Sequence, residues 1–209
     1  MIFTKSNTMK KIYPLFIFLF ASASSFAQIM FEKTFGSSVM NEWGNCVQQT
    51  SDSGYVLAGY YLNWQTNNLT DFYIVKTDAN GNAAWTKQIG DSTDWERANF
   101  IRQISDGGYI LTGYKLDSGA TYRDLWLVKT NSNGDTLWTK TYGGTLDDEG
   151  FTVHQTSDGG FIIGGYSFSV SMDAVYLIKT DANGDSLWTQ TYGVGTFNEG
   201  YSVQQTSDG

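Results

Sequence analysis

Cysteine, proline and histidine are almost absent from this chain of 209 residues, which contains one of each. The single cysteine, Cys46, excludes an internal disulfide, so packing and hydrogen bonds must hold the fold. The single histidine, His154, has no supporting motif for a Ser-His-Asp site or a histidine-rich metal centre. Outside the N-terminus, no stretch is apolar over the ~20 residues that a membrane span needs. These absences argue against a disulfide scaffold, a histidine-based enzyme and a membrane-spanning protein.

Basic residues are also scarce, with 13 Lys and Arg against 21 Asp and Glu and a net charge of −8. The first 27 residues carry three lysines and no acidic residue, so the remainder is more acidic still. An acidic surface repels phosphate backbones, and we therefore expect no nucleic-acid partner.

The N-terminus has the organisation of a cleavable signal peptide. Lysines precede an apolar run, Ile12–Ala21, which is followed by small residues and a cleavage motif that ends at Ala27. Met9 is an alternative start to Met1, because it opens a more typical signal. We predict a signal peptide over residues 1–27, export from the cell, and a secreted or cell-surface protein with no transmembrane segment after cleavage.

The rest of the chain, residues 28–209, is repetitive. WTKQIG at Trp85, WTKTYG at Trp138 and WTQTYG at Trp188 recur, and FEKTFG at Phe31 is a weaker copy. These starts at 31, 85, 138 and 188 are 54, 53 and 50 residues apart. A period near 50 residues indicates a modular array.

Each repeat is predicted to contain four strands. The first repeat has strands at Asn45–Thr50 and Tyr55–Tyr60 around an SDSG turn, a third strand from Phe72, and a fourth strand holding Trp85. Asn80-Gly81 is predicted to form a type I′ hairpin turn before the fourth strand. The later first strands are expected at Asn99–Ile104, Phe151–Thr156 and Tyr201–Thr206.

The third strands are apolar on both sides, since Phe72 and Ile74 alternate with Tyr73 and Val75. Two buried faces predict that each sheet is packed between neighbours. Four-stranded antiparallel sheets of about 50 residues each, stacked in this way, are the blades of an all-β propeller. The repeats amount to a lone fourth strand at Phe31, three complete sets and a lone first strand at Tyr201, which is an incomplete ring. We therefore expect the chain to be a fragment of a longer protein.

The pattern Y-G-G, S-D-G-G-[YF] and K-T-[DN]-x-N-G-[DN]-x-x-W-T-K resembles the repeat units of secreted bacterial β-propeller repeat proteins. TYGGTLDDEGFTVHQTSDGGFIIGGY and LIKTDANGDSLWTQTYG carry the likeness most clearly, and it extends from Phe31 to the end of the chain. The resemblance implies export and a propeller, with no single activity. It also implies a C-terminal sorting domain of a type IX secretion route, absent from the residues given. The strand-turn-Trp segment is more distantly similar to quinoprotein propellers.

Strand alternation places the SDGG and Asn-Gly turns at one end of the sheets and the variable segments Leu62–Thr70, Lys115–Arg123 and Ser167–Met172 at the other. Variable loops on a rigid scaffold are where binding sites concentrate. Exposed aromatic rings and carboxylates there would suit a carbohydrate or protein ligand. The candidate ligand-binding residues are Trp64, Asp94, Trp95, Tyr122, Asp147, Asp148 and Phe168. Solvated loops without a binding role are the alternative.

Other chemical signals are better explained by structure. Asp78-x-Asn80-Gly81-Asn82 resembles part of a calcium loop, but the full ligand set is missing and a hairpin turn accounts for it. The repeated acidic or amide positions before each first strand suggest a structural role, such as accepting loop backbone N–H groups, and the repeated glutamines and lysines suggest hydrogen bonds between neighbouring sheets. These residues are Glu42, Glu96, Asp148 and Asn198; Gln49, Gln103, Gln155 and Gln205; and Lys76, Lys129 and Lys179.

We therefore predict an exported, non-catalytic binding or display scaffold with no catalytic residue, cofactor or metal. The alternative is part of an extracellular carbohydrate-active enzyme, with catalytic residues on the variable loops or beyond Gly209. Paired carboxylates for glycoside cleavage could come from Asp94, Glu96, Asp147 and Asp148.

Overall fold

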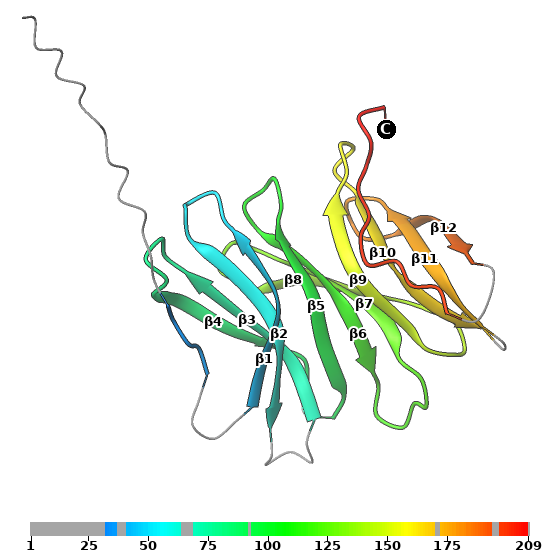
Figure 1. The fold of residues 1–209 in the computed structure, drawn as a ribbon, viewed down its shortest axis with the longest axis horizontal. Coiled ribbons are helices and arrows are strands. Elements are labelled where there is room, and N and C mark those ends of the chain that lie inside the picture. Colours follow the sequence, from blue (N-terminus) through cyan, green and yellow to red (C-terminus); the bar gives the residue numbers. More distant parts are fainter. Residues whose placement is uncertain are drawn as a thin grey trace, which may run out of the picture. The chain divides into compact units, whose positions relative to one another are not determined.

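The computed structural model describes residues 32–36, 41–63, 69–91, 93–169, 172–193 and 197–208. The predicted signal peptide and Trp64 lie outside these residues. The described part is all-β, with three four-stranded antiparallel sheets and no helix, as the sequence predicted (Figure 1). It accordingly contains no helix long and apolar enough to cross a membrane.

Every sheet is a meander in which strands adjacent in the chain are adjacent in space. The first sheet contains β1 (Asn41–Gln49), β2 (Tyr55–Asn63), β3 (Leu69–Thr77) and β4 (Ala83–Ile89). The second contains β5 (Trp95–Gln103), β6 (Tyr109–Leu116), β7 (Asp124–Thr130) and β8 (Thr136–Tyr142). The third contains β9 (Asp148–Gln155), β10 (Phe161–Ser169), β11 (Met172–Thr180) and β12 (Ser186–Tyr192). One repeat of the sequence thus supplies one sheet.

The first strand of each sheet begins earlier than predicted. β1, β5 and β9 start three to four residues upstream, so Glu42, Glu96 and Asp148 lie inside strands rather than before them. A β-bulge lets each strand continue past the expected start, as between Gly44 and Cys46 in β1. The opposing Gly59 has no room for a side chain, since a Cβ there would lie 1.7 Å from the carbonyl oxygen of Trp43.

The Asn-Gly turns are not of type I′, because only the glycine has positive φ, as at Gly81 (77°). Asp78 determines the turn instead. Its carbonyl accepts the N–H of Gly81 at 3.1 Å, and its Oδ1 accepts the N–H groups of Asn80 and Asn82 at 2.8 Å each. Because the carboxylate closes the turn, the hairpin explanation accounts for the calcium-like motif.

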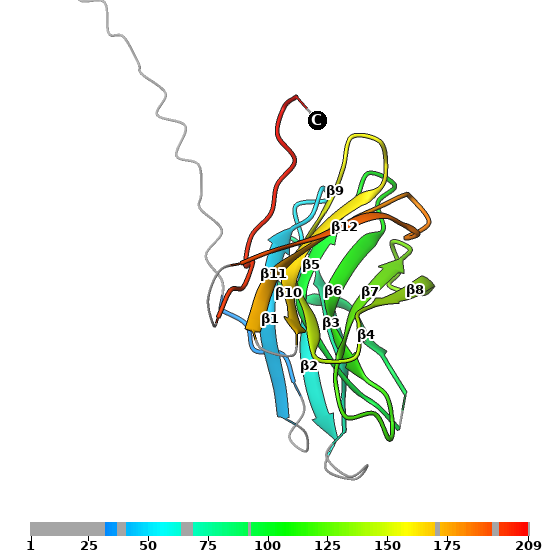
Figure 2. The same ribbon diagram turned by 90° about the vertical axis from the view of Figure 1, so that its right-hand side faces the viewer.

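Adjacent sheets pack face to face, as Figures 1 and 2 show from two directions. One core lies between the first two sheets and contains Phe72, Ile74, Trp126 and Val128. A second core lies between the second and third sheets and contains Leu125, Leu127, Phe161 and Ile163. The four consecutive residues of β7 from 125 to 128 alternate between the two cores, which confirms the prediction of two buried faces for the middle sheet.

Gln103 and Gln155 join neighbouring sheets, as predicted, and Gln205 forms the same bond from the segment 197–206 to the third sheet. Gln103, Gln155 and Gln205 each accept, through Oε1, the N–H of the serine in the preceding SD-G turn at 2.8 to 2.9 Å. The repeated lysines do not join sheets, and that prediction was wrong. Lys76, for example, pairs at 2.7 Å with Asp52 in the turn of its own sheet, which is the nearest carboxylate that its side chain reaches.

The two lone strands predicted at the ends of the repeat region are absent from the described residues. Residues 32–36 and 197–206 contain no strand. The second segment nevertheless lies along the third sheet, since the N–H of Gly200 donates to the carbonyl of Gly165 at 3.0 Å. Tyr201 stacks on Phe151 with ring centroids 4.7 Å apart. Strand assignment needs a ladder of such bonds, and neither segment has one among the described residues.

Candidate functional site

The described residues that flank the variable segments lie at one end of the sheets, where β2, β6 and β10 end and β3, β5, β7, β9 and β11 begin, and we call this the loop end. Trp95, Tyr122 and Phe168 are exposed there, with 40%, 44% and 40% of their surface accessible. Asp94 and Asp148 are buried, whereas Asp147 is partly exposed. The aromatic rings are therefore available to a ligand, but two of the three predicted carboxylates are not.

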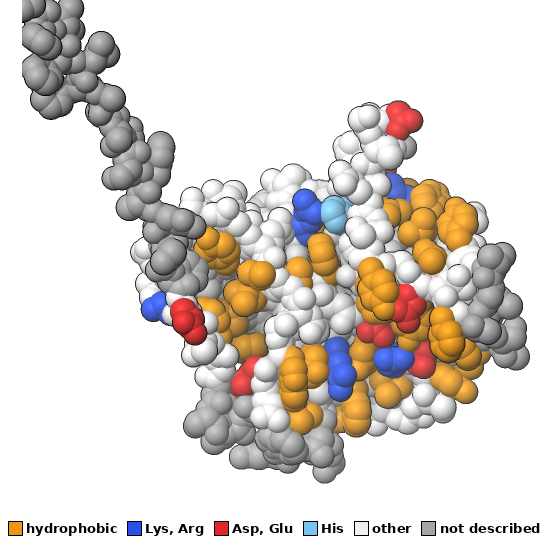
Figure 3. Space-filling view, viewed as in Figure 1, with side chains coloured by type: hydrophobic (Ala, Val, Ile, Leu, Met, Phe, Trp, Pro, Cys, Tyr) orange, Lys and Arg blue, Asp and Glu red, His pale blue; other side chains and the backbone are white. Residues whose placement is uncertain are grey.

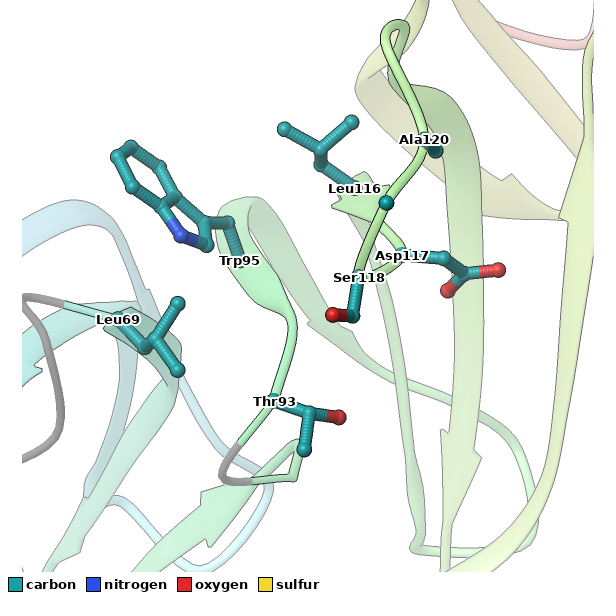
Figure 4. A pocket seen from close by; sticks show the side chains of 8 residues that line it. Leu69, Thr93, Trp95, Leu116, Asp117, Ser118 and Ala120 are labelled. Carbon is teal, nitrogen blue, oxygen red and sulfur yellow. The ribbon is translucent and has the colours of Figure 1, made fainter.

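A pocket of about 520 Å³ opens beside Trp95. Its walls come from the start of β5, from Leu69 at the start of β3, and from the loop of residues 116–120. Figure 4 shows the Trp95 indole opposite this loop, with the Asp117 carboxylate directed away from it. The indole, Leu69 and Leu116 supply apolar surface, and Thr93 and Ser118 supply hydroxyl groups. Such a combination suits a ligand with both apolar and hydroxylated faces.

Asp94 belongs to a carboxylate cluster that surrounds Lys115. The Lys115 Nζ lies 2.7 Å from Asp94, 3.2 Å from Asp117, and 3.8 Å from both Asp91 and Glu96. Asp91, Asp94 and Glu96 are close enough together to hold a metal ion. The ammonium group already supplies a cation at this position, so the arrangement is a lysine-centred ion cluster. Burial acts to lower the pKa of Lys115, but hydrogen bonds to Asp94 and Asp117 outweigh it and raise the pKa.

Glu96 has the most perturbed carboxyl group of the loop end. Its side chain is fully buried, and neither carboxylate oxygen has a hydrogen-bond partner among the described residues. Burial, followed by the charge of nearby Asp71, raises its pKa to about 8. Asp71 itself accepts a hydrogen bond from the Tyr61 hydroxyl at 2.6 Å, yet burial still raises its pKa. Two carboxyl groups therefore share an interior site between the first and second sheets.

The next interface repeats this pairing with Asp124 and Asp148. A Cβ on Gly143 would lie 2.2 Å from Asp124 Oδ1 and 2.7 Å from Asp148 Oδ2, so both carboxyl groups approach the same glycine. Burial raises the pKa of both aspartates. Asp148 Oδ2 accepts the N–H of Gly144 at 2.8 Å, which is the loop-bonding role expected for this position. Asn198 takes the equivalent position beyond β12, and its amide donates to the Asp173 carbonyl at 3.0 Å.

Asp147 is engaged by Arg123. The guanidinium lies 3.3 Å from Asp147 and 3.1 Å from Glu149, and it donates to the Tyr166 hydroxyl at 2.7 Å. The backbone N–H of Arg123 also donates to Asp147 Oδ1 at 2.8 Å. Asp147 thus fixes the 117–123 loop on the third sheet.

A row of stacked aromatic and arginine side chains at the loop end was not predicted from the sequence. Trp43 stacks on Tyr60 with centroids 4.8 Å apart. The Arg97 guanidinium carbon lies 4.5 Å from the centre of the Tyr60 ring and 6.0 Å from that of Tyr114. Arg123 continues the row, with its guanidinium carbon 4.8 Å from the centre of the Tyr114 ring. The repeated tyrosines at the end of each G-Y second strand were the available signal.

The opposite end of the sheets, which carries the SD-G and Asn-Gly turns and which we call the turn end, contains no comparable site among the described residues. An Arg102 Nη1 lies 2.7 Å from the His154 Nδ1, and burial together with this positive charge lowers the pKa of His154. Cys46 packs against the first core, and burial raises the pKa of its thiol. Both residues have structural surroundings.

Comparison with known proteins finds no family model that matches this chain and no match among curated proteins. The resemblance to secreted β-propeller repeat proteins therefore remains a prediction from the repeat motifs.

Proposed function

We propose that this chain is part of an exported, non-catalytic β-propeller that binds a carbohydrate or protein ligand at the cell surface or outside the cell. Support for the propeller comes from three consecutive meander sheets that pack face to face in chain order. Support for export comes from the signal peptide predicted over residues 1–27.

The pocket beside Trp95 carries the binding proposal. It combines an exposed indole with hydroxyl groups and lies on loops that differ between repeats, while the sheets beneath them are nearly constant. Indole rings are favourable platforms for the apolar face of a sugar ring, because they bury a large area at low entropic cost.

Burial of the perturbed carboxyl groups weighs against the alternative of a carbohydrate-active enzyme. A general acid must lie within hydrogen-bond reach of the glycosidic oxygen. Glu96 has the raised pKa that such an acid needs, but it has no exposed surface, and Asp148 has only 1%. We therefore assign these groups to the sheet interfaces.

The binding proposal is tested by titrating the chain with neutral oligosaccharides and following tryptophan fluorescence. We expect saturable binding that Trp95→Ala weakens at least about tenfold, since the lost stacking area contributes more than one kcal/mol. Trp188→Ala is the matched control, because Trp188 is similarly exposed at 44% but lies on β12, outside the pocket. Equal losses in the two variants would contradict a site at Trp95. Release of reducing sugar during incubation would contradict the non-catalytic proposal.

A further inference from the structure

Among the arginines of the described residues, Arg97 alone has a guanidinium with neither an ion pair nor a hydrogen bond to another side chain. Arg123 forms ion pairs with Asp147 and Glu149, and Arg102 bonds to His154. The Arg97 guanidinium instead lies over the Tyr60 ring and near that of Tyr114. Its Nε is buried and has no hydrogen-bond partner among the described residues. A buried donor without an acceptor is costly, and because Arg97 as a whole is only half-buried, the rest of its guanidinium remains open to an acceptor from outside the protein.

The planar guanidinium favours a planar acceptor with two oxygens. A carboxylate matches the parallel N–H groups of arginine and forms charge-assisted hydrogen bonds with them. Only one such group can be accommodated, because Arg123 is already paired and the protein carries a net charge of −8. A polyanion would be repelled by this charge. The chemistry therefore favours a ligand with a single carboxylate.

The surroundings of Arg97 favour a saccharide as the bearer of that carboxylate. Trp43 and Trp95 are each 40% exposed. Alternate residues of a strand share one side of the sheet, so Trp95 and Arg97 project from the same side of β5. Trp43 continues the aromatic row on the other side of Tyr60. Figure 3 shows basic side chains lying between hydrophobic ones on this face, with acidic groups beside them.

We propose that the loop end binds a saccharide bearing one uronate group, with its carboxylate on Arg97 and a neighbouring sugar ring on Trp95. This inference rests on the proposed binding function and specifies its ligand. Tyr60 and Tyr114 act as positioning residues, because their rings hold the guanidinium between the first and second sheets.

Two matched probes test the proposal on the full chain: an oligosaccharide ending in glucuronate and the same oligosaccharide ending in glucose. We expect the glucuronate probe to bind at least about tenfold more tightly, because the charge-assisted hydrogen bonds to its carboxylate should lower the dissociation constant by more than a factor of ten. Arg97→Gln should abolish this preference, and Arg97→Lys should restore only part of it. Trp95→Ala should weaken both probes by a similar factor.

Arg102→Gln is the control variant, since it makes the same charge change on the same strand but lies at the turn end. It should keep the preference for glucuronate. Unchanged melting temperatures would show that the variants fold, and the two wild-type titrations test the proposal even if a variant unfolds.

The remaining outcomes separate this inference from the proposed function. Equal binding of both probes by the wild type would overturn the uronate assignment and leave the saccharide site at Trp95 standing. Binding of neither probe would overturn both. A peptide with a free C-terminal carboxylate that binds as tightly as the glucuronate probe, with no loss in Trp95→Ala, would show that the carboxylate belongs to a protein ligand and would overturn the saccharide assignment.

Discussion

The two ends of the sheets treat charge in opposite ways. At the turn end, the same ion pair recurs in all three sheets, because Lys76, Lys129 and Lys179 each pair with a partly exposed aspartate of an SD-G turn. At the loop end, each of the two sheet interfaces instead buries a pair of carboxyl groups, Asp71 with Glu96 and Asp124 with Asp148, and not all of their oxygens are hydrogen-bonded. Uniform, solvated ion pairs indicate a structural role in every repeat. Buried carboxyl groups with unsatisfied oxygens lower stability, and a binding role at this end would explain why they are kept.

The largest expected effect is the loss of Lys115, which would leave the carboxylates around it without their cation. Lys115→Met should lower the free energy of unfolding by about 3 kcal/mol, because the Asp94 carboxylate is buried and cannot be solvated by water. Lys129→Met at the turn end is the matched control and should cost about 1 kcal/mol or less, since its partner Asp106 is 49% exposed. Urea denaturation at pH 7 measures both. Equal costs would remove the contrast between the ends.

The pH dependence of stability should carry the signature of Glu96. Its folded-state pKa is about 8, above the ordinary 4.5, so the folded protein binds the proton more tightly than the unfolded chain. Stability should therefore fall as pH rises from about 4.5 to about 8. Glu96→Gln should remove this fall and stabilise the protein by on the order of 2 kcal/mol at pH 8.

An aspartate of the turn end should give the opposite sign. Burial alone would raise the pKa of Asp106, but the hydrogen bonds from Lys129 and the Gly108 N–H, together with the Lys129 charge, outweigh it and lower the pKa, so Asp106→Asn should destabilise the protein at neutral pH. Thermal unfolding over pH 4 to 9 distinguishes the two variants. A stabilising Asp106→Asn, or a Glu96→Gln variant that retains the wild-type pH dependence, would contradict this assignment.

The smallest expected effect concerns a defect in one turn. Ser53 has φ of 66°, where the equivalent Gly107 and Gly159 have 83°. Ser53→Gly should raise the free energy of unfolding by about 0.5 to 1 kcal/mol, because a side chain is unfavourable in the left-handed region. Ser51→Gly in the same turn, where φ is not positive, should give no gain. A urea midpoint that does not move for Ser53→Gly would show that the turn tolerates serine without strain.

Local signals predicted the fold well, because each repeat restates them. The glycines with positive φ, the apolar third strands and the order of four strands all follow from residues close together in the chain. The type I′ turn was wrong because the Asp78 carboxylate competes with the intrinsic preference of Asn-Gly. The early starts of β1, β5 and β9 depend on bulges opposite glycines, which periodicity does not reveal.

The candidate site was less predictable, because it is built from residues of different repeats. Exposure of Trp95, Tyr122 and Phe168 was predicted from loop positions and was confirmed, although Trp95 and Phe168 lie at the ends of β5 and β10 rather than in loops. The burial of Asp94 was not predicted, since it depends on an ion pair with Lys115 on the neighbouring strand β6. The position of Arg97 over Tyr60 joins two sheets and has no local signature.

The glutamine bonds between sheets have a consequence for how the array assembles. The bonded residues are 52, 50 and 48 positions apart in the chain, so every docking step closes a loop of nearly the same length. The entropy lost in such a step depends on loop length and should therefore be almost equal at each interface. Since each sheet contacts its neighbour in the chain, the sequence separation between contacting residues stays constant as repeats are added. Gene duplication could then lengthen such an array by whole repeats without slowing the docking of any one of them.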